Sequence, residues 1–231
     1  MNKLKRLQQT LDAKFADVMT SHSLAHGEVT IEVQAEHLFN VCKLLHDDAD
    51  LNFACLIDVC GVDYLSYGVD DWQTNSATST GFDRGVEADS EKPNSIWKKP
   101  RFAVVYHLLS LAHNQRLRVR TFAQGEPPMV DSVIHIWQSA NWFEREAFDL
   151  FGIFFKGHPD LRRILTDYGF VGHPMRKDFP TSGHVEVRYD HARGRVVNQP
   201  ISIAPRTLVP RVIRHDNRYQ DNNAKGSDKH A

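Results

Sequence analysis

Residues 142–180 read WFEREAFDLFGIFFKGHPDLRRILTDYGFVGHPMRKDFP, and this stretch decides how the rest of the chain is interpreted. Its first ten residues contain neither proline nor glycine, and Gly152 has the position of a helix C-terminal stop. The sequence therefore predicts a helix over residues 142–151. At about 100° per residue, one face of this helix is apolar. That face carries Phe143, Ala147, Leu150 and Phe151, with Phe148 at its edge.

The charged residues of this helix need partners. Glu144 falls inside the apolar arc, and a buried carboxylate must be paired or protonated, so we expect it to pair with an arginine. The candidates are Arg162, Arg163 and Arg176. Arg145 and Asp149 lie four residues apart on the opposite face, where they can form an ion pair. Trp142 projects from the same charged face, so we expect the helix to be enclosed on both sides.

A long spaced motif resembles the signature of the C subunit of respiratory complex I, which is the hydrophilic peripheral-arm subunit of the proton-translocating NADH:quinone oxidoreductase. The motif consists of ERE at 144–146, Asp149, Leu150-Phe151, His158, Arg162 and Ile164-Leu165. The run GHPMRKDFP at 172–180 is similar to the next block of that family, and SVIHIWQSANW at 132–142 is similar to the preceding block. The resemblance extends from about Leu38 to Pro180.

The resemblance implies a set of signature residues that lie at a subunit interface. These are Trp142, Glu144, Arg145, Glu146, Asp149, His158, Arg162, Arg163, His173, Arg176, Lys177 and Asp178. It implies no catalytic, cofactor-binding or metal-binding residue, because FMN and the iron–sulfur clusters belong to partner subunits. The expected partners are other peripheral-arm subunits, especially the D subunit with the quinone site and the cluster-bearing B and I subunits. The expected location is the cytoplasmic face of the bacterial inner membrane, as a peripheral protein held through the complex.

Composition excludes several other classes of protein. A net charge of -1 over 231 residues is not that of a basic nucleic-acid binder. No apolar run approaches the ~18 residues that span a bilayer, so any membrane association must be indirect. The first 20 residues lack the apolar core of a signal peptide. Cys42, Cys55 and Cys60 are an odd number of thiols, which favours reduced cysteines that pack in the interior.

Hydrophobic periodicity predicts an α+β domain over residues 1–155, with an antiparallel-rich sheet and helices packed against it. The predicted helices cover 4–18, 35–47, the region after an N-cap at Ser132, and 142–151; the predicted strands cover 29–33, 54–60, 102–111 and 116–123. The last two strands are expected to form a hairpin. Residues 63–100 are rich in polar residues and lack a period, so they are predicted to be a mobile insertion.

The C-terminal third is expected to be mostly irregular. We predict that residues 156–215 form an extended arm that docks on a partner subunit, and that residues 216–231 are a disordered tail. Pro200, Pro205 and Pro210 disfavour a helix. The apolar residues of this segment have no domain of their own in which to be buried: Leu208, Val209, Val212 and Ile213. An arm on a partner explains them better than a solvated tail does.

The chain contains no G-x-G-x-x-G or G-x-x-x-x-G-K-[ST] loop and no G-x-S-x-G motif. The acidic group Glu144, Glu146 and Asp149 has two interpretations, ionic packing or general acid/base and metal chemistry. Two alternatives to the complex I interpretation therefore stay open. One is the equivalent subunit of a related membrane-bound hydrogenase, and the other is a free-standing carboxylate-dependent enzyme.

Overall fold

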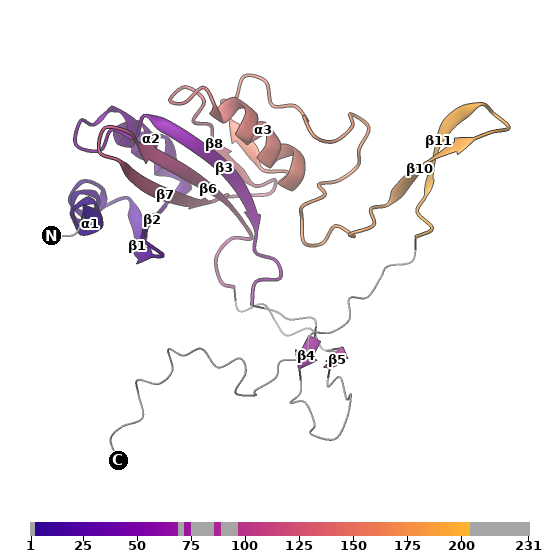
Figure 1. The fold of residues 1–231 in the computed structure, drawn as a ribbon, viewed down its shortest axis with the longest axis horizontal. Helices are drawn as coiled ribbons and strands as arrows, with labels where there is room; N and C mark the ends of the chain where they lie inside the picture. The colour runs from indigo at the N-terminus through magenta and orange to yellow at the C-terminus, as the bar shows by residue number, and fades with distance from the viewer. Residues whose placement is uncertain (1–2, 69–71, 75–85, 89–96, 204–231) are drawn as a thin grey trace, which may run out of the picture. The chain divides into compact units, whose positions relative to one another are not determined.

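The computed structural model describes residues 3–68, 72–74, 86–88 and 97–203, and its main body comprises residues up to Leu65 together with 97–201 (Figure 1). The elements of this body are α1 Lys3–Phe15, β1 Met19–Ala25, β2 Glu28–Val33, a 3-10 turn at Ala35–His37, α2 Leu38–Asp47, β3 Cys55–Asp63, β6 Phe102–Ser110, β7 Gln115–Phe122, β8 Met129–Asp131, α3 Ala140–Phe151, β9 Phe154–Lys156, β10 Val185–Asp190 and β11 Arg195–Pro200. In a separate unit, β4 Trp72–Thr74 pairs with β5 Val86–Ala88.

One five-stranded sheet organises the main body, with the order β1-β2-β7-β6-β3. Only the β2–β7 pair in this sheet is parallel, which confirms the predicted α+β fold with an antiparallel-rich sheet. The alternation of buried and exposed side chains shows which face of the sheet is turned to the core. On β7, Leu117 and Val119 are buried, whereas Arg118 and Arg120 point to the other face and form ion pairs with glutamates of β2. The predicted β6–β7 hairpin is also confirmed.

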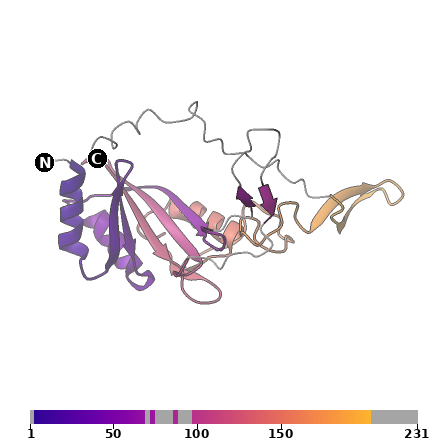
Figure 2. The same ribbon diagram turned by 90° about the horizontal axis from the view of Figure 1, so that it is seen from below.

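The helices α1 and α2 lie on the same side of this sheet (Figure 2). Leu7, Leu11 and Phe15 of α1 are buried in the core, as periodicity predicts. The helix α3 packs against β3, which is the strand at one edge of the sheet. There, Gly61 leaves room for the Phe151 ring, because an added Cβ would lie 2.5 Å from Phe151 Cδ2. Glycine is thus required on β3 for this close approach.

Three features differ from the prediction. The strand β1 is an edge strand with almost all residues exposed, so its polar sequence shows no apolar alternation. The strands β8 and β9 have three residues each, too few for a period. The predicted helix after Ser132 is wrong, because residues 134–136 form a turn and α3 begins at Ala140. The main-chain N–H of Val133 and the hydroxyl of Ser132 contact Glu144 instead.

The described part of the predicted arm is extended but folds back on itself. β10 and β11 form an antiparallel hairpin, with Gly194 in the left-handed region (φ 59°) at its turn. Four of its apolar side chains are more than half exposed: Val185, Val187, Tyr189 and Val196. Leu208, Val209, Val212, Ile213 and the expected tail lie outside the described residues, as does most of the expected insertion over 63–100.

Candidate functional site

The helix α3 positions the signature residues and ends where the sequence predicts. Gly152 has φ 72°, and its N–H donates to the Phe148 carbonyl oxygen at 2.8 Å. A side chain at this position would also collide with His173 and Arg176. Glycine therefore both stops the helix and allows the chain at 173–176 to pack against the helix end.

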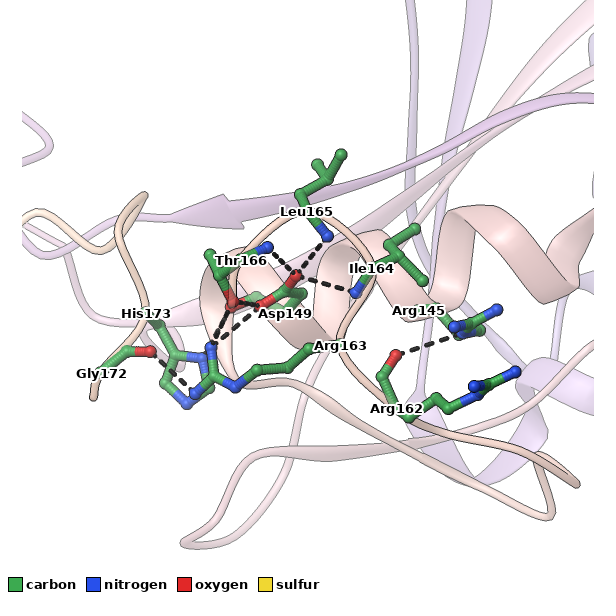
Figure 3. A network of polar contacts seen from close by, with 9 residues as sticks. All are labelled: Arg145, Asp149, Arg162, Arg163, Ile164, Leu165, Thr166, Gly172 and His173. Carbon is green, nitrogen blue, oxygen red and sulfur yellow. Dashed lines mark hydrogen bonds and ion pairs between the residues drawn. The ribbon is translucent and has the colours of Figure 1, made fainter. Parts of the chain in front are cut away.

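Asp149 organises the segment that follows the helix (Figure 3). Its buried carboxylate accepts hydrogen bonds from Arg163 Nη1 at 2.9 Å and from the Thr166 hydroxyl. It also accepts the main-chain N–H groups of Ile164, Leu165 and Thr166, at 3.1, 2.8 and 2.9 Å. Arg163 Nη2 then donates to the Gly172 carbonyl oxygen at 3.0 Å. We call residues 149, 163–166, 172 and 173 the Asp149 cluster.

The electrostatics of the Asp149 cluster favour the ionised aspartate. Burial alone would raise the pKa of Asp149, but the hydrogen bonds from Thr166, Leu165 and Ile164 outweigh it and hold that pKa well below its usual value. His173 Nδ1 donates to the Asp149 carbonyl oxygen at 2.9 Å. Burial lowers the pKa of His173, and Arg176 and Arg163 add to that effect. A carboxylate with this many donors acts as a structural tie for residues 163–173.

A second ion-pair group ties the end of the signature stretch to the sheet. Arg101 binds Asp63 through two bonds, Nε to Oδ1 at 2.8 Å and Nη2 to Oδ2 at 2.7 Å. It also contacts Asp178 at 2.9 Å, and the main-chain N–H of Lys177 donates to Asp63 at 2.9 Å. The predicted site did not include Asp63 or Arg101. The sequence signal for this pair was that the two residues lie at the two ends of the polar 63–100 segment.

Arg176 links the same region to the helix end. Its Nε donates to the Phe151 carbonyl oxygen at 2.7 Å, and its guanidinium carbon lies 4.9 Å from the centre of the Phe102 ring. Burial lowers its pKa, and the neighbouring Arg101 charge lowers it further. Arg176 therefore caps a main-chain carbonyl of α3 and packs on an aromatic ring, with no role in holding Glu144.

The predicted arginine partner of Glu144 is wrong. Glu144 is fully buried, with the Ser132 hydroxyl at 2.5 Å and the main-chain N–H of Val133 at 2.8 Å as its partners. Burial raises its pKa to about 7, although both of these hydrogen bonds act in the opposite direction. Burial also raises the pKa values of Cys42 and Tyr106, and the nearby Glu144 charge adds to both shifts. The apolar arc was correctly identified, but α3 turns this arc toward the core and away from the arginine-rich loop.

The predicted Arg145–Asp149 ion pair is also wrong, because Asp149 binds Arg163. Arg145 is 6% exposed, and its Nε donates to the Arg162 carbonyl oxygen at 3.1 Å. Both faces of α3 thus carry buried charged residues, so the expected enclosure on both sides holds at Arg145 and Asp149 but not at Trp142, which is exposed. The enclosing chain on the charged side is the loop after α3.

The remaining predicted residues are less buried than Glu144, Arg145 and Asp149. Trp142 is 61% exposed, Glu146 is half-buried, and Lys177 and Asp178 are exposed. His158 is half-buried, and its Nε2 donates to the Asn141 carbonyl oxygen at 3.3 Å. The structure brings Asp149, Arg163 and His173 together and leaves Glu146 and Lys177 apart from them. In the described residues, no group of three or more His, Cys, Asp or Glu side chains is placed to hold a metal ion.

Comparison with known proteins identifies the family. The family described as "Respiratory-chain NADH dehydrogenase, 30 Kd subunit" matches residues 31–185. The chain belongs to this family. The matched range runs from β2 to the first residue of β10, so it contains the Asp149 cluster and the Arg101 group.

Curated relatives extend the match over nearly the whole chain. A protein of Coxiella burnetii, named as the C subunit of NADH-quinone oxidoreductase, is 62% identical over 192 residues, covering 83% of this chain and 85% of that protein. A protein of the same name from Legionella pneumophila is 54% identical over 228 residues, covering 99% of this chain and 100% of that protein.

A solved structure shows the same fold at low identity. It is described as the membrane-bound sulfane sulfur reductase, an archaeal respiratory membrane complex, and one of its chains is 18% identical to this chain. The match covers 78% of this chain and 86% of that one, with a TM-score of 0.54. No helix among the described residues is both long enough and apolar enough to traverse a membrane.

Proposed function

We propose that this chain is a structural, non-catalytic subunit of the peripheral arm of a proton-translocating NADH:quinone oxidoreductase. The complex couples electron transfer from NADH to quinone with proton translocation. The observation that carries the proposal is the 54% identity to the C subunit of an NADH-quinone oxidoreductase, over 99% of this chain and 100% of that protein. The names of the relatives favour this enzyme over a membrane-bound hydrogenase.

The geometry of the acidic residues supports a structural role. Asp149 receives hydrogen bonds from Arg163, from Thr166 and from three main-chain N–H groups, and Glu144 is fully buried. Neither carboxylate is open to a substrate, as a general acid or base must be. Two of the three acids that suggest a free-standing enzyme in the sequence, Glu144 and Asp149, therefore serve packing in the fold.

The cofactors and partners follow from this assignment. FMN and the iron–sulfur clusters belong to neighbouring subunits, and this chain holds none of them. We propose contacts with the D subunit, which has the quinone site, and with the cluster-bearing B and I subunits. The chain then lies on the cytoplasmic face of the bacterial inner membrane and is held there by the complex.

The C-terminal hairpin is the part of the predicted arm that supports docking. A two-stranded hairpin is marginally stable by itself in water. Val185, Val187 and Tyr189 alternate along β10 and are all more than half exposed. Burying apolar side chains of this size contributes about 1.5–3 kcal/mol each before ordering costs. We therefore propose that a partner subunit covers this face, and a chain that ends after Gly183 is expected to lose its place in the complex.

The experiment that tests the function uses the purified full-length chain and the complex. The chain alone is expected to show no visible chromophore, no stoichiometric metal and no NADH oxidation. Membranes from cells that lack the chain are expected to lose NADH:quinone activity and to regain it when the chain is supplied. A flavin or cluster at one equivalent in the pure chain, or full activity in its absence, would refute the proposal.

A further inference from the structure

Arg145 is a buried cation without a carboxylate partner in the described part of the chain. The residue is 6% exposed, and the sole hydrogen bond of its guanidinium among the described residues runs from Nε to the Arg162 carbonyl oxygen at 3.1 Å. The half-buried signature arginine Arg163, in contrast, has Asp149 at 2.9 Å. The two terminal amino groups of Arg145 still reach solvent, and a guanidinium with unfilled N–H groups favours a bound anion. Both groups therefore remain available for one.

The surroundings of Arg145 are positively charged. Its Nε binds the main chain of Arg162, and Figure 3 shows the Arg145 and Arg162 side chains pointing in the same direction, away from Asp149. The Asp160 carboxylate binds Arg162 Nε at 2.9 Å and is itself more than half exposed. Burial lowers the pKa of the neighbouring His158, and the Arg145 charge lowers it further. Asp160 thus offsets the charge of Arg162, and Arg145 has no described carboxylate within ion-pair distance.

An exposed tryptophan completes this surface. Trp142 is 61% exposed, and the guanidinium carbon of Arg145 lies 5.1 Å from the centre of its ring. A tryptophan left in water beside an arginine is typical of a protein interface, because these two residue types are enriched where binding energy concentrates. A guanidinium held against a ring also presents its remaining N–H groups in a fixed plane, which suits a carboxylate.

We propose that Arg145, Arg162 and Trp142 form a docking site for an acidic side chain, Asp or Glu, of a neighbouring subunit. The carboxylate binds the free N–H groups of Arg145 with Arg162 beside it, and Trp142 packs on the segment that carries the acid. The inference rests on the proposed function, since it requires a neighbouring subunit. It goes further by naming the residues of one interface and the chemistry of the partner.

The test uses a carbodiimide, which joins an amine to a carboxylate only when the two are in contact. Complex containing the Arg145→Lys variant is treated with the reagent, and the products are mapped by mass spectrometry. The expected product is an amide between the amine at position 145 and an Asp or Glu of another subunit. The matched control is Arg101→Lys in the same complex, whose expected product is an amide to the exposed Asp178 within this chain.

Binding provides the second measurement. Arg145→Met removes the charge and keeps an unbranched side chain, so the variant chain alone is expected to melt like the parent or higher. Its affinity for the complex lacking this chain is expected to fall by about 10- to 100-fold, the range for a charged hydrogen bond at an interface. Arg163→Met is expected to lower the melting temperature of the chain alone, because it leaves Asp149 unpaired.

The outcomes separate this inference from the proposed function. Unchanged affinity for Arg145→Met, or a cross-link from position 145 to a carboxylate of this same chain, would overturn the docking site. So would a loss of stability in Arg145→Met as large as that in Arg163→Met. In each of these three cases the parent chain would still assemble into the complex. The proposed function would therefore stand. If the parent chain assembles with no other protein, the proposed function itself fails.

Discussion

Replacing Glu144 with glutamine probes a buried carboxylate that has no described cation beside it. Glu144 is fully buried on the core side of α3, with Ser132 and Val133 as its hydrogen-bond partners and no described cation in contact. Glutamine keeps the shape of the side chain and removes its ability to ionise. The variant therefore isolates the free energy of placing a carboxylate in the core.

The magnitude follows from the pKa of Glu144, which burial raises from 4.5 to about 7. Between these two pH values the folded chain holds a proton on Glu144 that the unfolded chain has lost. The folded state therefore binds more protons there, and its stability falls as pH rises from 4.5 to about 7, with no further loss above it. A shift of this size corresponds to about 3 kcal/mol, because each pKa unit is worth about 1.4 kcal/mol.

The assay is urea unfolding of parent and Glu144→Gln chains from pH 4.5 to pH 8. Tryptophan fluorescence reports the transition, since Trp137 is buried with its indole N–H on the Phe53 carbonyl oxygen. The stability of the variant relative to the parent is expected to rise by about 3 kcal/mol over this range. The control is Glu146→Gln on the same helix, which removes a half-buried charge and is expected to change little.

A stability difference between parent and Glu144→Gln that does not vary with pH would refute this reasoning. If the stability of the variant relative to the parent fell as pH rises, Glu144 would have the arginine partner that the sequence suggests. A carboxylate paired with arginine has a lowered pKa, so the parent would then gain stability over the variant as pH rises.

Two further substitutions test the packing around α3. Asp149→Ala leaves Arg163 and the amides of 164–166 without a partner, and it is expected to cost about 3–5 kcal/mol in urea unfolding. Because the pKa of Asp149 is lowered in the fold, its contribution is lost as pH falls below the usual range of aspartate, so the gap to the variant should close in acid. Gly61→Ala places a methyl group against the Phe151 ring and is expected to cost about 1–3 kcal/mol. Adding Phe151→Leu should recover part of that loss, and full stability of Gly61→Ala alone would contradict the packing described for α3 and β3.

The sequence predicts the elements that have a strong period. The apolar spacing in α1 and α2 and the alternation in β2 and β7 report burial directly, and these elements lie where they were expected. The edge strand β1 has no buried face and therefore no period. Ser132 accepts the Ile134 main-chain N–H at 3.3 Å, as an N-cap would, and its hydroxyl donates to Glu144, but the chain that follows forms a turn and not a helix.

The sequence singles out Asp149, Arg163 and His173, which the fold brings together, but it misses Asp63 and Arg101 and most of the contacts. Periodicity places Glu144 inside and Arg145 on the opposite face, and both placements hold. It does not say which of several arginines meets which acid, because that depends on the path of the loop after Gly152. Asp149 collects the main-chain N–H groups of that loop together with Arg163, so Arg145 has no described carboxylate.

The most direct test of the assignment is to identify what the native chain assembles with. The chain, carrying an affinity tag and produced at its normal level, is extracted in mild detergent, and the co-purifying proteins are quantified by mass spectrometry. We expect the other subunits of an NADH:quinone oxidoreductase in equimolar amounts, with NADH:quinone activity in the same fraction. A chain that purifies alone, or with the subunits of a different enzyme, would contradict the assignment.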